Sequence, residues 1–153
     1  MVYIAIIIAI FLCELLIKNY IEKNKTEDTY EPVLGGRIFI RKFLNRGALL
    51  NLGNQRRRIV AAVSLFFTVL MILFFLVTLT RKGNTCLKIG LAFLLGGAFS
   101  NTYDRLKRKY VVDYFSFRSR FSGVAGIIFN IADFCIAIGA AMAAIAVILD
   151  PRF

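Results

Sequence analysis

The sequence predicts an α-helical integral membrane protein with four transmembrane helices and a few short strands at the membrane surface. Of its 153 residues, 59% are hydrophobic, whereas soluble domains are about half apolar. The apolar residues are gathered into four blocks, and polar segments rich in Lys and Arg lie between them. Because an α-helix satisfies its own backbone hydrogen bonds in lipid, we expect one domain of four helices.

The four apolar blocks define the expected helices in chain order. They cover residues 1–20, 59–80, 86–104 and 124–149. The first contains Glu14 and lacks the basic start and cleavage site of a signal peptide, so we expect it to be retained. The second is uncharged. The third is short for a span of about 20 residues unless Lys88 reaches the headgroups, and the fourth carries a single charge, Asp133.

A polar loop of residues 21–58 follows the first helix. Its first part reads as irregular loop, but residues 33–53 are rich in β-branched and aromatic residues and contain several glycines. This composition is typical of short strands. Residues 110–121 have the same character, so they either pair with the first segment or lie along the membrane interface, where aromatic residues are favoured.

The composition excludes several classes of site. The sequence contains no histidine, which excludes Ser–His and Cys–His catalysis and His-ligated metals. Its three cysteines lack the spacing of metal ligands or of a disulfide framework, so we expect neither a metal nor another cofactor. The formal net charge is +11, but the basic residues lie between apolar blocks. We therefore expect contact with anionic lipid headgroups and no nucleic-acid partner.

Four acidic residues lie in or beside the apolar blocks and, with four spans, should lie near one membrane face. They are Glu14, Asp104, Asp113 and Asp133. Charges at membrane depth are unfavourable and usually mark a functional site or a buried pair. Arg105 directly follows Asp104 and supplies a countercharge, whereas no basic residue lies near Asp133 in the sequence. A second carboxylate close to Asp133 could share one proton with it, as in aspartic proteases, and Asp113 is the natural candidate.

Two asparagines precede these carboxylates by three residues: Asn101 precedes Asp104, and Asn130 precedes Asp133. Positions three apart share a helix face, so each asparagine is expected beside its carboxylate, as a hydrogen-bond partner or aimed at the same ligand. The residues alone leave three interpretations open. They are an acidic catalytic pair, a buried structural network, and an ion or proton pathway.

Three motifs follow one another in the C-terminal half: "NTYDR", "VVDY" and "FNIAD". They resemble bacterial lipoprotein signal peptidase, also called signal peptidase II. In that family Asn-x-x-Asp-Arg ends a glycine-rich helix, Val-Val-Asp and an aromatic residue follow, and Phe-Asn-x-Ala-Asp begins the last helix. The N-terminal half matches less well: "ELLIK" stands in place of Asp-Gln-x-x-Lys, and "NRGALL" keeps part of Asn-x-Gly-Ala-Ala-Phe.

The resemblance implies a single membrane-embedded peptidase domain over residues 1–153, in the bacterial plasma (inner) membrane. Both termini would be cytoplasmic, and a small β-cradle, an interfacial segment and the active site would lie at the outer face. The family is implied to act as an aspartic endopeptidase that cleaves prolipoproteins just before a diacylglyceryl-modified cysteine. The implied partners are such prolipoproteins and membrane lipids, and we expect a monomer.

The resemblance also implies roles for individual residues. The catalytic pair falls on Asp113 and Asp133. Substrate-contacting positions fall on Asn45, Asn101, Arg105 and Asn130. The surrounding structural shell contains Asp104, Glu14 and Lys18. Three residues depart from the family pattern, because Glu14 stands for Asp, Ser100 for Gly and Phe134 for a small polar residue.

Orientation and function both have alternatives. Residues 18–58 and 105–120 hold sixteen of the twenty Lys and Arg residues, and the positive-inside rule would put them in the cytoplasm, whereas the family puts them outside. A small channel or transporter could use Asp113 and Asp133 as a proton or cation relay. A non-catalytic homologue could act as a scaffold.

Overall fold

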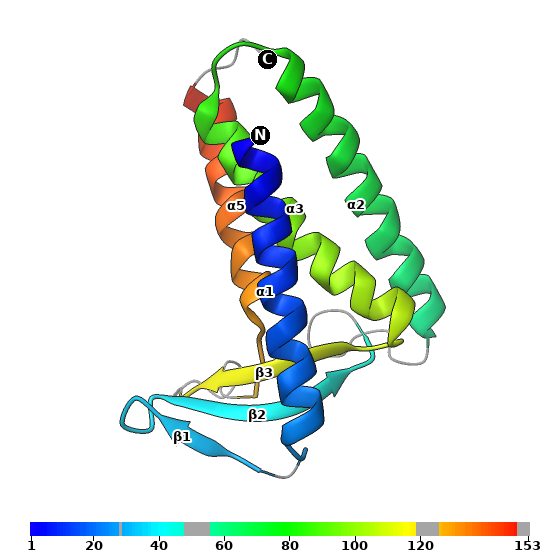
Figure 1. The fold of residues 1–153 in the computed structure, drawn as a ribbon, viewed down its shortest axis with the longest axis vertical. Coiled ribbons are helices and arrows are strands. Elements are labelled where there is room, and N and C mark those ends of the chain that lie inside the picture. The colour runs from blue at the N-terminus through cyan, green and yellow to red at the C-terminus, as the bar shows by residue number, and fades with distance from the viewer. Residues whose placement is uncertain (28, 48–55, 119–125, 150–153) are drawn as a thin grey trace.

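The computed structural model describes residues 1–27, 29–47, 56–118 and 126–149, which form four helices and a three-stranded sheet (Figure 1). The helices are α1 (Val2–Asn24), α2 (Arg57–Thr80), α3 (Thr85–Lys107) and α5 (Ile131–Leu149). The strands are β1 (Glu31–Val33), β2 (Ile38–Asn45) and β3 (Val111–Phe117). Helices α1, α2 and α5 are long and apolar enough to cross a membrane. The predicted fold class, four membrane helices with short strands, is confirmed.

Helix α3 lies at the centre of the bundle and packs against each of the other three helices. Twelve of its 23 residues are buried, compared with three of 23 in α1 and three of 24 in α2. Five of its polar side chains, Lys88, Ser100, Asn101, Thr102 and Asp104, are therefore buried in protein. This burial explains how the least apolar of the four helices is accommodated in a membrane bundle.

Helices α3 and α5 approach so closely that glycine is required on both sides of their contact. A Cβ added at Gly97 would overlap the backbone oxygen of Ala132, and one added at Gly139 would overlap the backbone of α3. Small residues allow such close packing in lipid. The contact brings the start of α5, which carries Asp133, against the polar part of α3 around Asn101.

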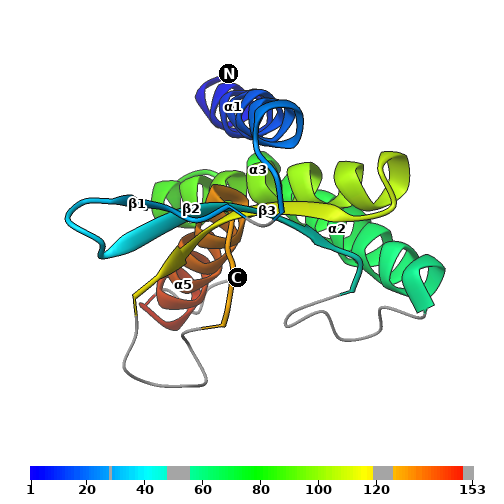
Figure 2. The same cartoon turned by 90° about the horizontal axis from the view of Figure 1, so that it is seen from below.

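The antiparallel sheet, in the order β1-β2-β3, lies at one end of the bundle, away from the N-terminal end of α1 and the C-terminal end of α5 (Figure 1). Seen from below, α1 and α5 lie on opposite sides of the strands (Figure 2). Phe43 of β2 lies opposite Asp113 of β3, and Asn45 lies opposite Val111. The second β-prone segment therefore pairs with the first. Residues 48–53 and 119–121 of these two segments lie outside the described residues.

Several element boundaries differ from the prediction. Helix α2 begins two residues early, at Arg57, and α3 ends three residues late, at Lys107. Helix α1 continues to Asn24, beyond residue 20, and β1 begins at Glu31, where irregular loop was expected. Helix α5 begins at Ile131, whereas the prediction started it at residue 124; residues 124 and 125 lie outside the described part. Helix α5 starts later than expected because a β-bridge lies just before it, in which the Phe129 N–H donates to the Phe115 carbonyl at 2.8 Å. An extended Phe129 cannot belong to the helix.

Candidate active site

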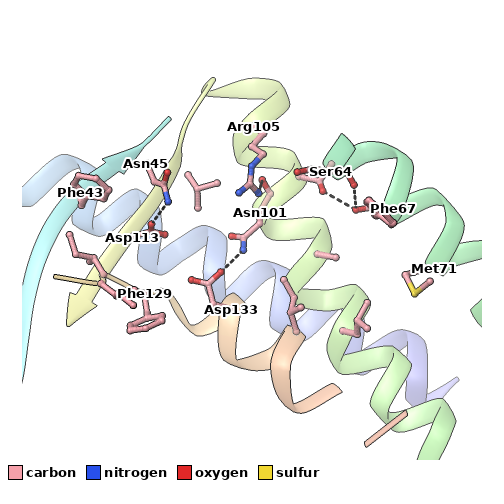
Figure 3. Close-up of a pocket in the computed structure, with 18 of the residues that line it drawn as sticks. Phe43, Asn45, Ser64, Phe67, Met71, Asn101, Arg105, Asp113, Phe129 and Asp133 are labelled. Atoms are coloured by element: carbon pink, nitrogen blue, oxygen red, sulfur yellow. Dashed lines mark hydrogen bonds between the residues drawn. The ribbon is translucent and has the colours of Figure 1, made fainter. Parts of the chain in front are cut away.

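A cavity of about 620 Å³ lies between α2, α3, α5 and the adjoining strands β2 and β3. Its polar lining includes Asn45, Asn101, Arg105, Asp113 and Asp133 (Figure 3). Phe67 and Met71 of α2 lie on the other side of the cavity, away from the aspartates (Figure 3). The cavity therefore combines an acidic centre with an apolar wall.

Asp113 extends from β3 into this cavity and is only 3% exposed. The side-chain amide of Asn45, at the end of β2, donates to Asp113 Oδ2 at 3.0 Å. The amide of Asn130, which directly precedes α5, donates to Asp113 Oδ1 at 2.6 Å. Segments that are far apart in sequence therefore hold this carboxylate from both sides.

Asp133 is held by a capping box at the start of α5. Asn130 is the N-cap residue, and its side-chain oxygen accepts a hydrogen bond from the Asp133 N–H at 3.0 Å. In return, the Asn130 N–H donates to Asp133 Oδ2 at 3.1 Å. This reciprocal pattern satisfies two backbone donors at the helix start and holds the carboxylate in one orientation. The sequence correctly predicted that the two side chains are close, but Asn130 precedes the helix and does not lie on its face.

Asn101 reaches Asp133 from α3. Its Nδ2 donates to Asp133 Oδ1 at 2.8 Å, and its Oδ1 accepts from the buried Lys18 ammonium at 2.9 Å. Of the two arrangements predicted for Asn101 and Asp104, the second is found, because both bind the Lys18 ammonium, which lies 3.0 Å from Asp104 Oδ2. The hydrogen bond from Asn101 to Asp133 was not predicted. The close contact between α3 and α5 offers a carboxylate across the interface, which helical spacing alone could not reveal.

Together these contacts give every oxygen of the two aspartates one hydrogen-bond donor. Asp113 accepts from Asn45 and Asn130, and Asp133 accepts from the Asn101 amide and the Asn130 backbone. A carboxylate oxygen has two lone pairs, so each retains capacity for a water molecule or a shared proton. The arrangement orients both carboxylates and leaves room for acid–base chemistry between them.

The pKa of Asp113 is raised to about 7, mainly because burial disfavours the charged form and also because Asp133 lies nearby. Hydrogen bonds from Asn45 and Asn130 and the charge of Lys18 oppose this shift of the pKa. A carboxyl group whose pKa lies near neutrality can both accept and donate a proton at physiological pH. This value suits an acid–base role for Asp113.

A buried ion cluster lies behind the two aspartates. The Lys18 ammonium, fully buried, is 3.2 Å from Glu14 Oε2 and 3.0 Å from Asp104 Oδ2. Asp104 also pairs with Arg108 Nε at 3.1 Å. The countercharges of Asp104 are thus Lys18 and Arg108, and the predicted partner Arg105 is not among its ion pairs in the described structure. Adjacent helix positions point about 100° apart, so Arg105 lines the cavity instead.

Residues 6–149 match the protein family described as signal peptidase (SPase) II. The chain belongs to the signal peptidase II family. A lipoprotein signal peptidase of Halothermothrix orenii is 28% identical over 142 residues, covering 93% of this chain and 91% of that protein. One of Clostridioides difficile is 31% identical over 139 residues, covering 91% and 89%.

Solved structures carry the same fold as this signal peptidase II family member. A bacterial membrane enzyme determined at 2.3 Å resolution superposes with a TM-score of 0.82 at 20% identity, covering 98% of this chain and 89% of the other. A second, at 1.9 Å resolution, gives a TM-score of 0.81 at 22% identity, covering 97% and 94%. The protein is therefore a membrane protein and, by its family, a protease.

The residues singled out in the sequence of this family member fall into two groups. Those expected to be catalytic or to contact substrate all line the cavity or bond to a residue that does. Those expected in the structural shell form the ion cluster behind it. The sequence reasoning missed Tyr114, whose hydroxyl donates to Glu14 at 2.5 Å and accepts from the Ile131 N–H at 3.1 Å. The sequence feature that could have identified Tyr114 is its position directly after "VVD", where the family also has an aromatic residue.

Proposed function

We propose that the protein is an aspartic endopeptidase that removes the signal peptide from prolipoproteins, cutting just before the diacylglyceryl-modified cysteine. The observation that carries this proposal is a pair of carboxylates, buried Asp113 and half-buried Asp133, held by three asparagines at one cavity. Membership of the signal peptidase II family and the lipoprotein signal peptidase relatives support the substrate class.

In the proposed reaction, the two aspartates share one proton. The ionised carboxylate takes a proton from water while the water oxygen attacks the scissile carbonyl carbon, and the protonated partner donates to the carbonyl oxygen. When the tetrahedral intermediate collapses, the C–N bond breaks and the pair delivers a proton to the leaving nitrogen. The products are a carboxyl-terminated signal peptide and a lipoprotein with a free amino group on its cysteine.

The cavity suits a lipidated substrate. Its apolar wall on α2 can accept acyl chains or the apolar part of the signal peptide. Asn45 and Asn101 line the cavity, and each amide has a second N–H for a substrate carbonyl. Asn130 is fully buried and holds Asp113, so its place among the substrate contacts rests on the family resemblance. Arg105 Nη1 donates to the Asn101 carbonyl at 3.3 Å, which keeps the guanidinium at the cavity wall. We therefore propose that Asn45, Asn101, Asn130 and Arg105 contact the substrate backbone while the asparagines also hold the aspartates.

We propose further that the chain lies in the bacterial plasma membrane with both termini in the cytoplasm. The sheet end of the bundle, with the active site, would then face outward. Several basic residues at this end already have partners: Arg108 pairs with Glu22, and Lys25 lies 2.5 Å from Glu31. The positive-inside rule gives little weight to acidic residues, so these pairs do not remove the conflict with the Lys and Arg count, and the proposed orientation rests on the family resemblance.

The decisive experiment incubates the purified protein with a diacylglyceryl-modified precursor and with the same precursor lacking the lipid. We expect cleavage of the lipidated precursor alone. Asp113→Asn and Asp133→Asn should each lower the rate to background while the protein still inserts into the membrane, because neither variant can share a proton across the pair. Substantial cleavage by both variants would contradict the acidic mechanism. pH-dependent ion flux in vesicles without any cleavage would favour a relay instead.

A further inference from the structure

Lys18 carries a fully buried charge with more oxygen partners than a lysine can satisfy at once. Its ammonium donates to Ser100 Oγ at 2.8 Å and to Asn101 Oδ1 at 2.9 Å, and it pairs with Glu14 and Asp104. An ammonium has three N–H bonds and no acceptor. Any oxygen that points at Lys18 is therefore held as an acceptor.

This property determines how the Asn101 amide is turned. Its oxygen faces the ammonium, so its NH₂ group must face Asp133 Oδ1 at 2.8 Å. In the reversed orientation the NH₂ group would meet the ammonium and the oxygen would meet a carboxylate. Both contacts would be repulsive, and unfavourable contacts between buried polar groups are especially destabilising.

The other two asparagines of the site are oriented in a different way. Asn45 Oδ1 accepts from the Gly47 backbone N–H at 3.1 Å, and Asn130 Oδ1 accepts from the Asp133 backbone N–H at 3.0 Å. Backbone donors are present whatever the side chains are. Among the three amides, Asn101 alone has its oxygen held by a side chain in the described hydrogen bonds.

We propose that Lys18 is a positioning residue for peptide hydrolysis, which holds the Asn101 amide so that it always donates to Asp133. The inference rests on the proposed function and deepens it. Loss of the ammonium would let the Asn101 amide turn over and present its oxygen to Asp133. The carboxylate would then lose a hydrogen bond and its fixed orientation, although Lys18 and its ion-pair partners are not among the residues that line the cavity.

The test is a double-mutant cycle on the purified full-length protein with the lipidated precursor. The variants are Lys18→Met, Asn101→Ala and the double variant. Methionine keeps the length of the side chain but cannot donate. We expect Lys18→Met to lower kcat on the order of 100-fold, as misplaced catalytic groups do, with KM little changed. If Lys18 acts through Asn101, the double variant should be no slower than Asn101→Ala.

Lys88→Met is the matched control. Lys88 is also buried and on a membrane helix, but its ammonium donates to the Arg81 carbonyl at 2.6 Å, in the turn between α2 and α3. We expect Lys88→Met to leave kcat unchanged. A near-normal kcat for Lys18→Met, or losses that multiply in the double variant as they do for independent sites, would overturn the proposal.

Loss of the Lys18 charge could prevent folding, because it leaves Glu14 unpaired. In that case the same cycle is run with Glu14→Gln in every member, which removes one negative charge along with the positive one, while Asp104 keeps Arg108. In this background too, a near-normal kcat after Lys18→Met, or losses that multiply in the double variant, would overturn the proposal. If the unsubstituted protein does not cleave the lipidated precursor at all, the proposed function is wrong. If the unsubstituted protein cleaves it and Lys18→Met is equally active, only the positioning role of Lys18 is wrong.

Discussion

At the scale of single residues, Asp113 shows how burial produces an acid–base group. Burial raises its pKa to about 7 from an ordinary value of 3.8, with Asp133 adding to the shift. Because the pKa is raised in the folded state, the contribution of Asp113 to stability is fully present below pH 3.8 and is lost as the pH rises through about 7. The shared proton of the pair should be lost in the same upper range.

The rate of cleavage should therefore fall above about pH 7, and Asn45→Ala should move this fall to higher pH. The reason is that the Asn45 hydrogen bond lowers the pKa of Asp113 by stabilising its charged form. The measurement is kcat/KM against pH with the lipidated precursor. Asn24→Ala is the control, since the exposed Asn24 amide donates to the Tyr20 carbonyl of its own helix at 2.8 Å. A fall that moves to lower pH in Asn45→Ala would contradict this assignment.

Two residues that depart from the family pattern have clear contacts in the ion cluster. Ser100, which stands for glycine, supplies a hydroxyl acceptor to Lys18 at 2.8 Å. Glu14, which stands for aspartate, reaches the Tyr114 hydroxyl at 2.5 Å while it pairs with Lys18. Ser100 thus adds an acceptor for the ammonium, whereas Glu14 Oε1 is hydrogen-bonded and its Oε2 has the ion pair with Lys18 but no hydrogen bond among the described residues.

At the scale of elements, the first turn of α5 combines a structural and a functional task in Asn130. Its side-chain oxygen caps the helix, and its NH₂ group donates to Asp113. A carboxylate in the first turn is also favoured by the helix dipole, which suits Asp133. The helix start and the position of the Asp113 carboxylate are therefore coupled through one side chain.

These two tasks can be separated by substitution. Serine caps helices about as well as asparagine, whereas alanine does not, and neither can donate to Asp113 from the same position. Asn130→Ala should lower the free energy of unfolding by about 1 kcal/mol more than Asn130→Ser does. Both should lose most activity. Denaturation in detergent and cleavage assays measure the two effects, and an active, stable Asn130→Ser would show that the bond to Asp113 is dispensable.

Phe134, the third departure from the family pattern, joins α5 to the sheet. Its ring lies 5.6 Å from those of Phe115 and Phe129 and 6.1 Å from that of Phe117, measured between centroids. Aromatic pairs of this kind contribute about 0.5–1.5 kcal/mol each beyond their area. An aromatic residue here ties the strand that carries Asp113 to the helix that carries Asp133.

Phe134→Leu should therefore destabilise the protein by about 1 kcal/mol or more, because leucine keeps apolar volume but loses the ring contacts. Phe74→Leu is a suitable control, since Phe74 on α2 is 38% exposed, close to the 36% of Phe134, and takes part in no ring pair among the described residues. Thermal unfolding in detergent compares the two variants. Equal midpoints would indicate that the aromatic cluster adds nothing to stability.

At the scale of the whole molecule, the orientation in the membrane can be tested with single cysteines. The native Cys13, Cys86 and Cys135 are first replaced by alanine. We expect a cysteine introduced in place of Arg37, which is exposed at the sheet end, to react with an impermeant maleimide in intact spheroplasts. One at Lys82, exposed at the opposite end, should react only after permeabilisation. The reverse pattern would put the sheet in the cytoplasm, as the positive-inside count suggests.

Much of the architecture was predictable because it depends on local properties. Hydrophobic blocks long enough to span a bilayer identify helices, and β-branched and aromatic residues identified β2 and β3. The start of α5 was not predictable in this way, since Phe129 is apolar like the helix that follows. Its extended backbone depends on a bridge to Phe115 in a different element.

The sequence by itself determined the membrane class, the helices, and the charged and asparagine residues that line the cavity, because hydropathy and motif order are properties of the chain. Tertiary structure decided which of these residues bond to one another. Asn101 with Asp133, Asn45 with Asp113, and Lys18 with Asp104 each join different elements. Such pairs depend on how closely the helices and strands pack, and the glycine contact between α3 and α5 is what brings Asn101 to its aspartate.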